Sequence, residues 1–241
     1  MDADEPLGTL AFGSCRKQNR SQPIWAAVAA LKPDAFVWLG DYVYGGKYAA
    51  TPAELASYYA KAAEVDAPLR ASTRVIDGVY DDHDYGENDA GMRYPHREAA
   101  RRLFLDAVGA PADSPRRTQS GGLYGARTFG TPPRQVKLVM LDTRYARDDH
   151  VIPSVGASRW LPKPGYFAGA LRALCAAVGY GREHPGDMLG SEAQWQWLED
   201  ELLGKENESK KTSSSVVPAA TIVLSTLPVL GKKTPLFCAI L

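Results

Sequence analysis

Short apolar runs alternate with amphipathic segments along the first third of the chain. Residues 9–12 and 35–39 are apolar runs that end in a turn, which is typical of strands. Between them, residues 23–31 place a proline near the first turn and apolar side chains on one face, which predicts a helix. Strand, helix and strand in this order predict a parallel unit with a right-handed crossover.

The same two patterns continue toward the C-terminus and predict an α/β fold without internal repeats. Further strands are predicted at residues 74–80, 123–129, 136–141 and 219–224, and further helices at residues 52–65, 96–108, 167–178 and 191–202. A Gly- and Pro-rich region spans residues 146–190, and residues 205–215 form a polar, Ser-rich loop.

Length and composition place the chain among globular proteins. Its 241 residues fit one large domain or two small ones, and its 28 basic and 28 acidic residues give no excess charge that would indicate nucleic acid or a membrane surface. Three widely spaced cysteines argue against a disulfide framework. The acidic N-terminus has no signal-peptide pattern, and the apolar residues 216–230 are too short to span a bilayer. We therefore expect a soluble protein with no nucleic-acid-binding module and no membrane span, in a compartment that the sequence does not predict.

Residues with metal-binding chemistry follow three predicted strands. Cys15 follows the first, Asp41 the second, and Asp81, Asp82, His83 and Asp84 the third. The carboxyl ends of parallel strands share one edge of a sheet, so we expect these side chains to converge. Carboxylates so close together repel one another, and a divalent or trivalent cation would compensate them.

Each of these residues also has a structural alternative. The acidic cluster can be a solvated loop, Asp41 a turn or N-cap carboxylate, and Cys15 a small apolar residue. In a binuclear site, a carboxylate such as Asp41 can bridge two cations that bind a phosphate ester. His83 can then orient the substrate or protonate the leaving oxygen, and Arg144 can either face a phosphate or form a structural ion pair.

Five motifs follow one another along the chain, at residues 12–15, 38–44, 81–91, 141–145 and 189–199. In this order they resemble the alkaline phosphatase D (PhoD-like) family of calcineurin-like metallophosphoesterases. The resemblance covers about residues 9–225 of a single domain at 1–241 and implies a two-sheet β-sandwich flanked by helices. It also implies hydrolysis of phosphate mono- or diesters, with a small phosphate ester as substrate, by a metal-bound hydroxide.

The resemblance also assigns roles to individual residues. Cys15 becomes a ligand of iron, with calcium completing a binuclear or larger centre. Asp41 bridges the metals, Asp82 and Asn88 are further ligands, and His83 is the catalytic histidine. Arg144 remains the candidate for contacting the substrate.

The chain departs from the family pattern in two places. Gly45 and Gly46 stand where many relatives carry an acidic residue, and no histidine follows His184, although the family takes histidine ligands from a later segment. Residues 231–241 match no family motif. We therefore expect a fold that is incomplete at its C-terminus and an impaired activity. One alternative is a non-catalytic metal- or phosphate-binding remnant, and a more distant one is an α/β hydrolase with Cys15 as nucleophile.

Overall fold

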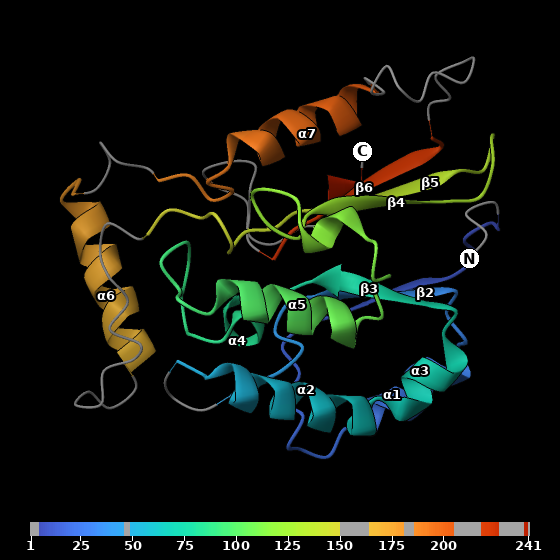
Figure 1. Cartoon of the computed structure of the whole chain (residues 1–241), viewed down its shortest axis with the longest axis horizontal. Helices are drawn as coiled ribbons and strands as arrows, with labels where there is room; N and C mark the ends of the chain where they lie inside the picture. Colours follow the sequence, from blue (N-terminus) through green and yellow to red (C-terminus); the bar gives the residue numbers. More distant parts are fainter. Residues whose placement is uncertain are drawn as a thin grey trace.

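The structure, a computed structural model, describes residues 5–45, 49–149, 164–180, 186–204, 218–226 and 239–240 and is a mixed α/β architecture (Figure 1). The strands are β1 Leu10–Gly13, β2 Ala35–Leu39, β3 Val75–Val79, β4 Gly125–Phe129, β5 Val136–Met140, β6 Ala220–Leu224 and β7 Ala239–Ile240. The helices are α1 Ile24–Ala30, α2 Pro52–Val65, α3 Ala67–Ser72, α4 Asp82–Tyr85, α5 Arg97–Ala107, α6 Pro164–Ala177 and α7 Glu192–Leu203, with a 3₁₀ turn at Pro115–Arg117.

The strands form two sheets of different character. The first has the order β1-β2-β3 with every pair parallel, which confirms the predicted strand–helix–strand unit. The second has the order β4-β5-β6-β7, and only β5 and β6 run parallel in it. The consequence for the site is that β1, β2 and β3 all end at the same edge of the first sheet.

The two sheets stack on each other, with helices on the outer sides (Figure 1). One apolar core joins them, because Phe36 of β2 and Leu138 and Met140 of β5 belong to the same buried cluster. The alternate residues of β5 face the other way, and Val139 packs with Leu198 of α7 in a second cluster. The period of two along β5 therefore buries both of its faces.

Strand β2 lies at the centre of the first sheet and is buried along almost its whole length. The ring of Trp38 lies 5.4 Å from that of Trp25 of α1 and 4.3 Å from that of Tyr42, measured between centroids. The guanidinium of Arg16 stacks on the same rings, 5.3 Å from that of Trp38. This packing holds the C-terminal end of β2, and with it Asp41, in one position.

Most predicted elements are confirmed, with ends shifted by one to three residues. Helix α2 has its predicted bounds, and Thr51 caps it together with Glu54 in a reciprocal capping box. The acidic cluster is the main difference, because Asp82–Tyr85 forms the one-turn helix α4 instead of an irregular loop. The predicted loop at residues 205–215 lies outside the described residues, as do residues 231–238 of the unmatched tail.

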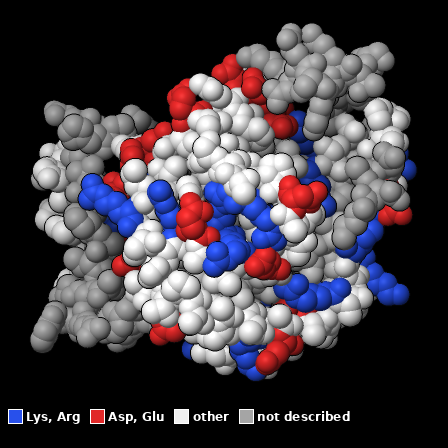
Figure 2. All heavy atoms as spheres, in the orientation of Figure 1, with Lys and Arg blue, Asp and Glu red and all other residues white. Residues whose placement is uncertain are grey.

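In the part of the chain that the structure describes, no helix has the length and apolar character needed to cross a membrane. Basic and acidic side chains lie intermingled on the face shown in Figure 2. Basic and acidic residues, which are equal in number in the sequence, are therefore also mixed in space on this face.

Candidate metal centre

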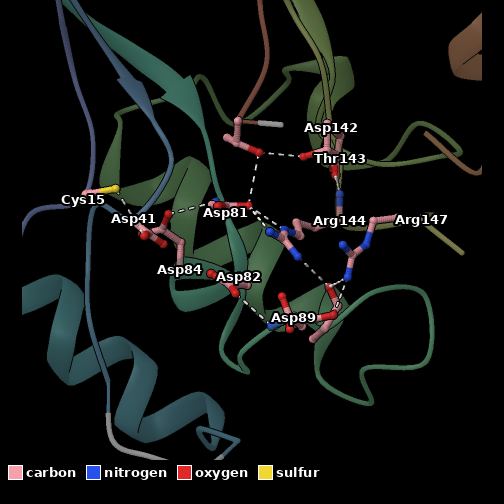
Figure 3. Close-up of polar contacts among 12 residues, drawn as sticks. Cys15, Asp41, Asp81, Asp82, Asp84, Asp89, Asp142, Thr143, Arg144 and Arg147 are labelled. Atoms are coloured by element: carbon pink, nitrogen blue, oxygen red, sulfur yellow. Dashed lines mark hydrogen bonds and ion pairs between the residues drawn. The ribbon is translucent and has the colours of Figure 1, made fainter. Parts of the chain in front are cut away.

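The three strand ends bring their polar side chains together, as the parallel order predicts. Cys15, Asp41 and Asp82 follow β1, β2 and β3 at the carboxyl edge of the first sheet (Figure 3). The sulfur of Cys15 lies 3.5 Å from Oδ2 of Asp41. Residues that are 26 positions apart in the sequence thus come into contact at this edge.

The backbone at these strand ends adopts conformations that L-residues rarely take. Cys15 has φ 56° and Asp41 has φ 54°, both in the left-handed region. Two backbone hydrogen bonds hold them there, from the amide of Cys15 to the carbonyl of Gly40 (3.3 Å) and from the amide of Arg16 to that of Asp41 (2.9 Å). Strained backbone of this kind concentrates at functional sites, so it marks this edge as a candidate site.

Gly40 is required for the close approach of β2 and the acidic cluster. Its φ is 78°, and a Cβ atom at this position would lie 2.5 Å from Cβ of Asp81 and 3.0 Å from its backbone nitrogen. Any larger residue would therefore push Asp81 away. The glycine at the turn after β2 therefore also sets the spacing between two strand ends.

Three of the residues at this edge can share one cation. Each of Asp41, Asp82 and His83 offers a ligand atom, and these atoms lie within 4.8 Å of one another. Oδ2 of Asp41 accepts from the hydroxyl of Tyr44, whereas its Oδ1 is buried and has no hydrogen-bond partner among the described residues. A buried carboxylate oxygen without a partner is costly, and a cation would satisfy it. The donor set thus fits a metal ion.

Asp82 is a buried carboxylate like Asp41. The turn that follows α4 orients it. Its Oδ2 accepts a hydrogen bond of 2.8 Å from the backbone amide of Asp89, which has φ 58°. Asn88 precedes Asp89 in this turn and is partly buried. The geometry brings Asp82 close to Asp41. The roles of Asp82 and Asn88 as metal ligands stay predictions.

Asp84 has a structural position behind the cluster. It is fully buried, and its two oxygens accept from the backbone amides of Val43 (2.8 Å) and Asp81 (3.0 Å). Burial, together with the nearby charge of Asp41, raises the pKa of Asp84 well above its usual value. Asp84 thus joins the loop after β2 to the start of α4.

Arg144 pairs with Asp81, which was the structural alternative left open by the sequence. Its Nε and Nη2 lie 2.6 Å and 2.5 Å from Oδ1 of Asp81, and its side chain is 3% exposed. Burial, opposed by Arg144 and reinforced by Asp82 and Asp41, raises the pKa of Asp81 to about 6. A role in substrate binding stays a prediction for this arginine.

Asp142 holds the segment that carries Arg144. One of its oxygens accepts from the amides of Arg144 and Tyr145, at 2.9 Å each, and the other accepts from the hydroxyl of Tyr80 at 2.7 Å. The amide of Asp142 donates to Gln194 of α7 at 2.8 Å. Through its carboxylate and its backbone amide, this fully buried residue therefore connects both sheets with α7.

Two residues that the sequence analysis did not single out complete the site. The ring of Tyr44 lies 4.3 Å from that of His83, and its hydroxyl donates to Asp41. Thr226, just beyond β6, donates to Asp81 at 3.2 Å and contacts Thr143 at 2.7 Å. Tyr44 lies three residues after Asp41 within one of the five motifs, which is a signal in the sequence, whereas Thr226 has no such signal.

The thiol of Cys15 is poorly suited to act alone as a nucleophile. Partial burial and the negative charge of Asp41 raise its pKa, in spite of hydrogen bonds with Ser14 and Tyr44 that lower it. A raised pKa disfavours the thiolate on which cysteine nucleophiles depend. A cation at this position would favour the thiolate, because a coordinating thiol is deprotonated.

No protein-family model matches the chain, and neither does any curated protein or solved structure. The functional inference therefore depends on the geometry of the strand-end cluster and on the motifs of the sequence.

Proposed function

We propose that this chain is a metal-dependent phosphoesterase of the PhoD-like, calcineurin-like type, acting on small phosphate mono- or diesters. The observation that carries the proposal is the position of Asp41. Asp41 offers a ligand atom to the group it forms with Asp82 and His83. Its Oδ1 is buried without a partner among the described residues, and its Oδ2 lies 3.5 Å from the sulfur of Cys15. A carboxylate with one oxygen beside a thiol and the other without a partner suits a bridging role.

The donor chemistry supports two kinds of cation. A thiolate from Cys15 together with a carboxylate suits iron, whereas the oxygen donors of Asp41, Asp82 and Asn88 suit calcium. When bound, such cations would act as Lewis acids toward the phosphoryl oxygens and lower the pKa of a bound water. This assignment extends the strand-end geometry with the roles that the family resemblance implies.

In this proposal Asp41 and Asp82 hold the cation, and His83 is the proton donor to the leaving oxygen instead of a ligand. The tilted stacking on Tyr44 restricts its ring, and the ligand atoms of Asp41 and Asp82 lie nearby. Histidine is the side chain that most often serves as a general acid, and an imidazolium can donate its proton to the leaving oxygen. Arg144 contributes to the site by pairing with Asp81, which directly precedes Asp82 and His83 in the chain.

The test is Asp41→Asn in the full chain, supplied with iron and calcium. We expect the hydrolysis of p-nitrophenyl phosphate or bis-p-nitrophenyl phosphate to fall at least about a hundredfold, because metal ions contribute several kcal/mol to such transition states. Elemental analysis should show less metal bound per chain. Asp113→Asn is the matched control, since Asp113 is exposed and is not among the strand-end residues, and it should retain both activity and metal.

Different results would support different functions. Metal uptake by the wild-type chain without turnover of either ester would favour the non-catalytic binding protein. If neither metal uptake nor turnover occurred, the proposal would be wrong. Inactivation by iodoacetamide without sensitivity to chelators would instead indicate Cys15 as a nucleophile.

A further inference from the structure

The turn after α4 is held by arginines from two distant parts of the chain. The carbonyl of Ala90 accepts from Nη2 of Arg147 at 3.2 Å and from Nη1 of Arg144 at 3.4 Å. The carbonyl of Asp89 also accepts from Arg147, and Arg172 of α6 contacts the carboxylate of Asp89 (Figure 3 shows the contacts of Arg144 and Arg147). Guanidinium groups thus approach this turn from more than one direction.

Asp89 is the residue through which this arrangement reaches the candidate metal centre. Its carboxylate pairs with Nη2 of Arg172 at 3.0 Å, and its backbone amide donates to the carboxylate of Asp82 at 2.8 Å. The two groups belong to one residue held in the left-handed conformation. The ion pair with Arg172 therefore restrains the same residue whose amide contacts Asp82.

Building on the phosphoesterase proposed above, we propose that Arg172 is a positioning residue for the candidate metal centre. It holds Asp89 so that the amide of Asp89 orients the Asp82 carboxylate toward Asp41 and His83. Helix α6 carries Arg172 and lies to one side of the two sheets in Figure 1. The position of α6 is thereby coupled to the orientation of Asp82, a candidate ligand 90 residues earlier in the chain. Outer partners that orient ligands commonly influence metal affinity.

The first test measures the turn itself, in the full chain without added metal. We expect Arg172→Ala to accelerate hydrogen exchange of the Asp89 amide by about three- to fivefold, as followed by NMR, because a partly exposed ion pair is lost. Arg172→Lys should restore most of the protection, since an ammonium can still pair with Asp89. Unchanged exchange at Asp89 in Arg172→Ala would overturn the proposal.

The second test is calcium titration by calorimetry. Removal of a positive charge near a cation site would by itself strengthen calcium binding. We expect the opposite, a fall in affinity of at least about threefold in Arg172→Ala, because Asp82 loses its orientation. Arg172→Ala and Asp89→Asn should be non-additive in a double-mutant cycle, since both break the same contact. An affinity that rises or stays equal in Arg172→Ala would contradict the positioning role.

Arg93→Ala is the matched control for both tests. Arg93 is an arginine of the same connection between α4 and α5, but it is 85% exposed and pairs with Asp149. Its removal should change neither the Asp89 amide nor calcium affinity, and an equal effect of both variants would overturn the proposal. If the wild-type chain bound neither calcium nor iron and hydrolysed neither ester, the proposed function would fail, whereas the metal-free exchange would still decide whether Arg172 orders the turn.

Discussion

At the residue scale, the candidate metal centre is marked by backbone strain. Cys15 and Asp41 both occupy the left-handed region, which costs about 1–2 kcal/mol for a residue with a Cβ. The strain persists because backbone hydrogen bonds between the two strand ends hold both residues in place. Two such residues in contact with each other favour a functional origin over a chance irregularity.

Asp84 is the residue whose loss should most affect the stability of this region. In Asp84→Asn an NH₂ group replaces one of two oxygens that accept from the amides of Val43 and Asp81. One buried amide then loses its acceptor, so we expect the free energy of unfolding to fall by about 1–3 kcal/mol in urea titrations. The exposed Asp113→Asn should stay within about 0.5 kcal/mol of the wild type. Equal stability of both variants would mean that the amides have other acceptors.

At the scale of elements, an ion-pair network joins β3 to β4 across the two sheets. Asp77 of β3 lies 2.6 Å from Arg116 and 2.9 Å from Arg127 of β4, and its side chain is 5% exposed. Burial alone would raise the pKa of Asp77, but the two guanidinium charges and the hydrogen bonds from Arg116 and Gly78 outweigh it and lower the pKa. The network therefore requires an ionised carboxylate.

The lowered pKa predicts a loss of stability in acid. The Asp77 carboxylate contributes fully above its unfolded pKa of about 3.9, and its contribution disappears as pH falls through the lower pKa of the folded state. At neutral pH we expect Asp77→Asn to be less stable than the wild type by about 3–5 kcal/mol, because Arg116 loses its buried partner. Urea titrations should show this difference shrinking below about pH 4. A difference that did not change with pH would contradict the lowered pKa.

At the scale of the whole molecule, the candidate centre lies where the two stacked sheets meet. The first sheet supplies Cys15, Asp41 and Asp82, whereas Arg144 and Thr226 follow strands of the second sheet and both contact Asp81. Through Asp142 and Gln194 the same region is connected to α7. Ligands that bind there would stabilise contacts between several layers at once.

Metal binding should therefore stabilise the whole fold. A cation that binds only the folded chain adds about 2.7 kcal/mol at a hundredfold excess over its Kd, so we expect calcium to raise the Tm measured by calorimetry. Asp41→Asn should remove most of this increase, whereas Asp113→Asn should keep it. An identical increase in all three proteins would place the bound cation elsewhere.

The local pattern of the chain was sufficient for much of the fold. Apolar runs and the helical spacing of apolar residues predicted the parallel unit β1-α1-β2 and the bounds of α2, since strand and helix periods depend on neighbouring residues. The pattern did not predict α4. Three acidic side chains in four positions disfavour a helix unless other segments donate hydrogen bonds to them. The amide of Val43, in the loop after β2, supplies such a contact by donating to the buried Asp84.

By itself, the sequence determined which polar residues follow which strands, and therefore that Cys15, Asp41 and Asp82 would converge at one edge. Only the tertiary structure decided their partners, because register and sheet stacking set contacts across many positions. Arg144 meets Asp81 across 63 positions, and Arg172 meets Asp89 across 83. Such pairs depend on how the sheets and helices pack, which no local pattern of hydrophobic and polar residues contains.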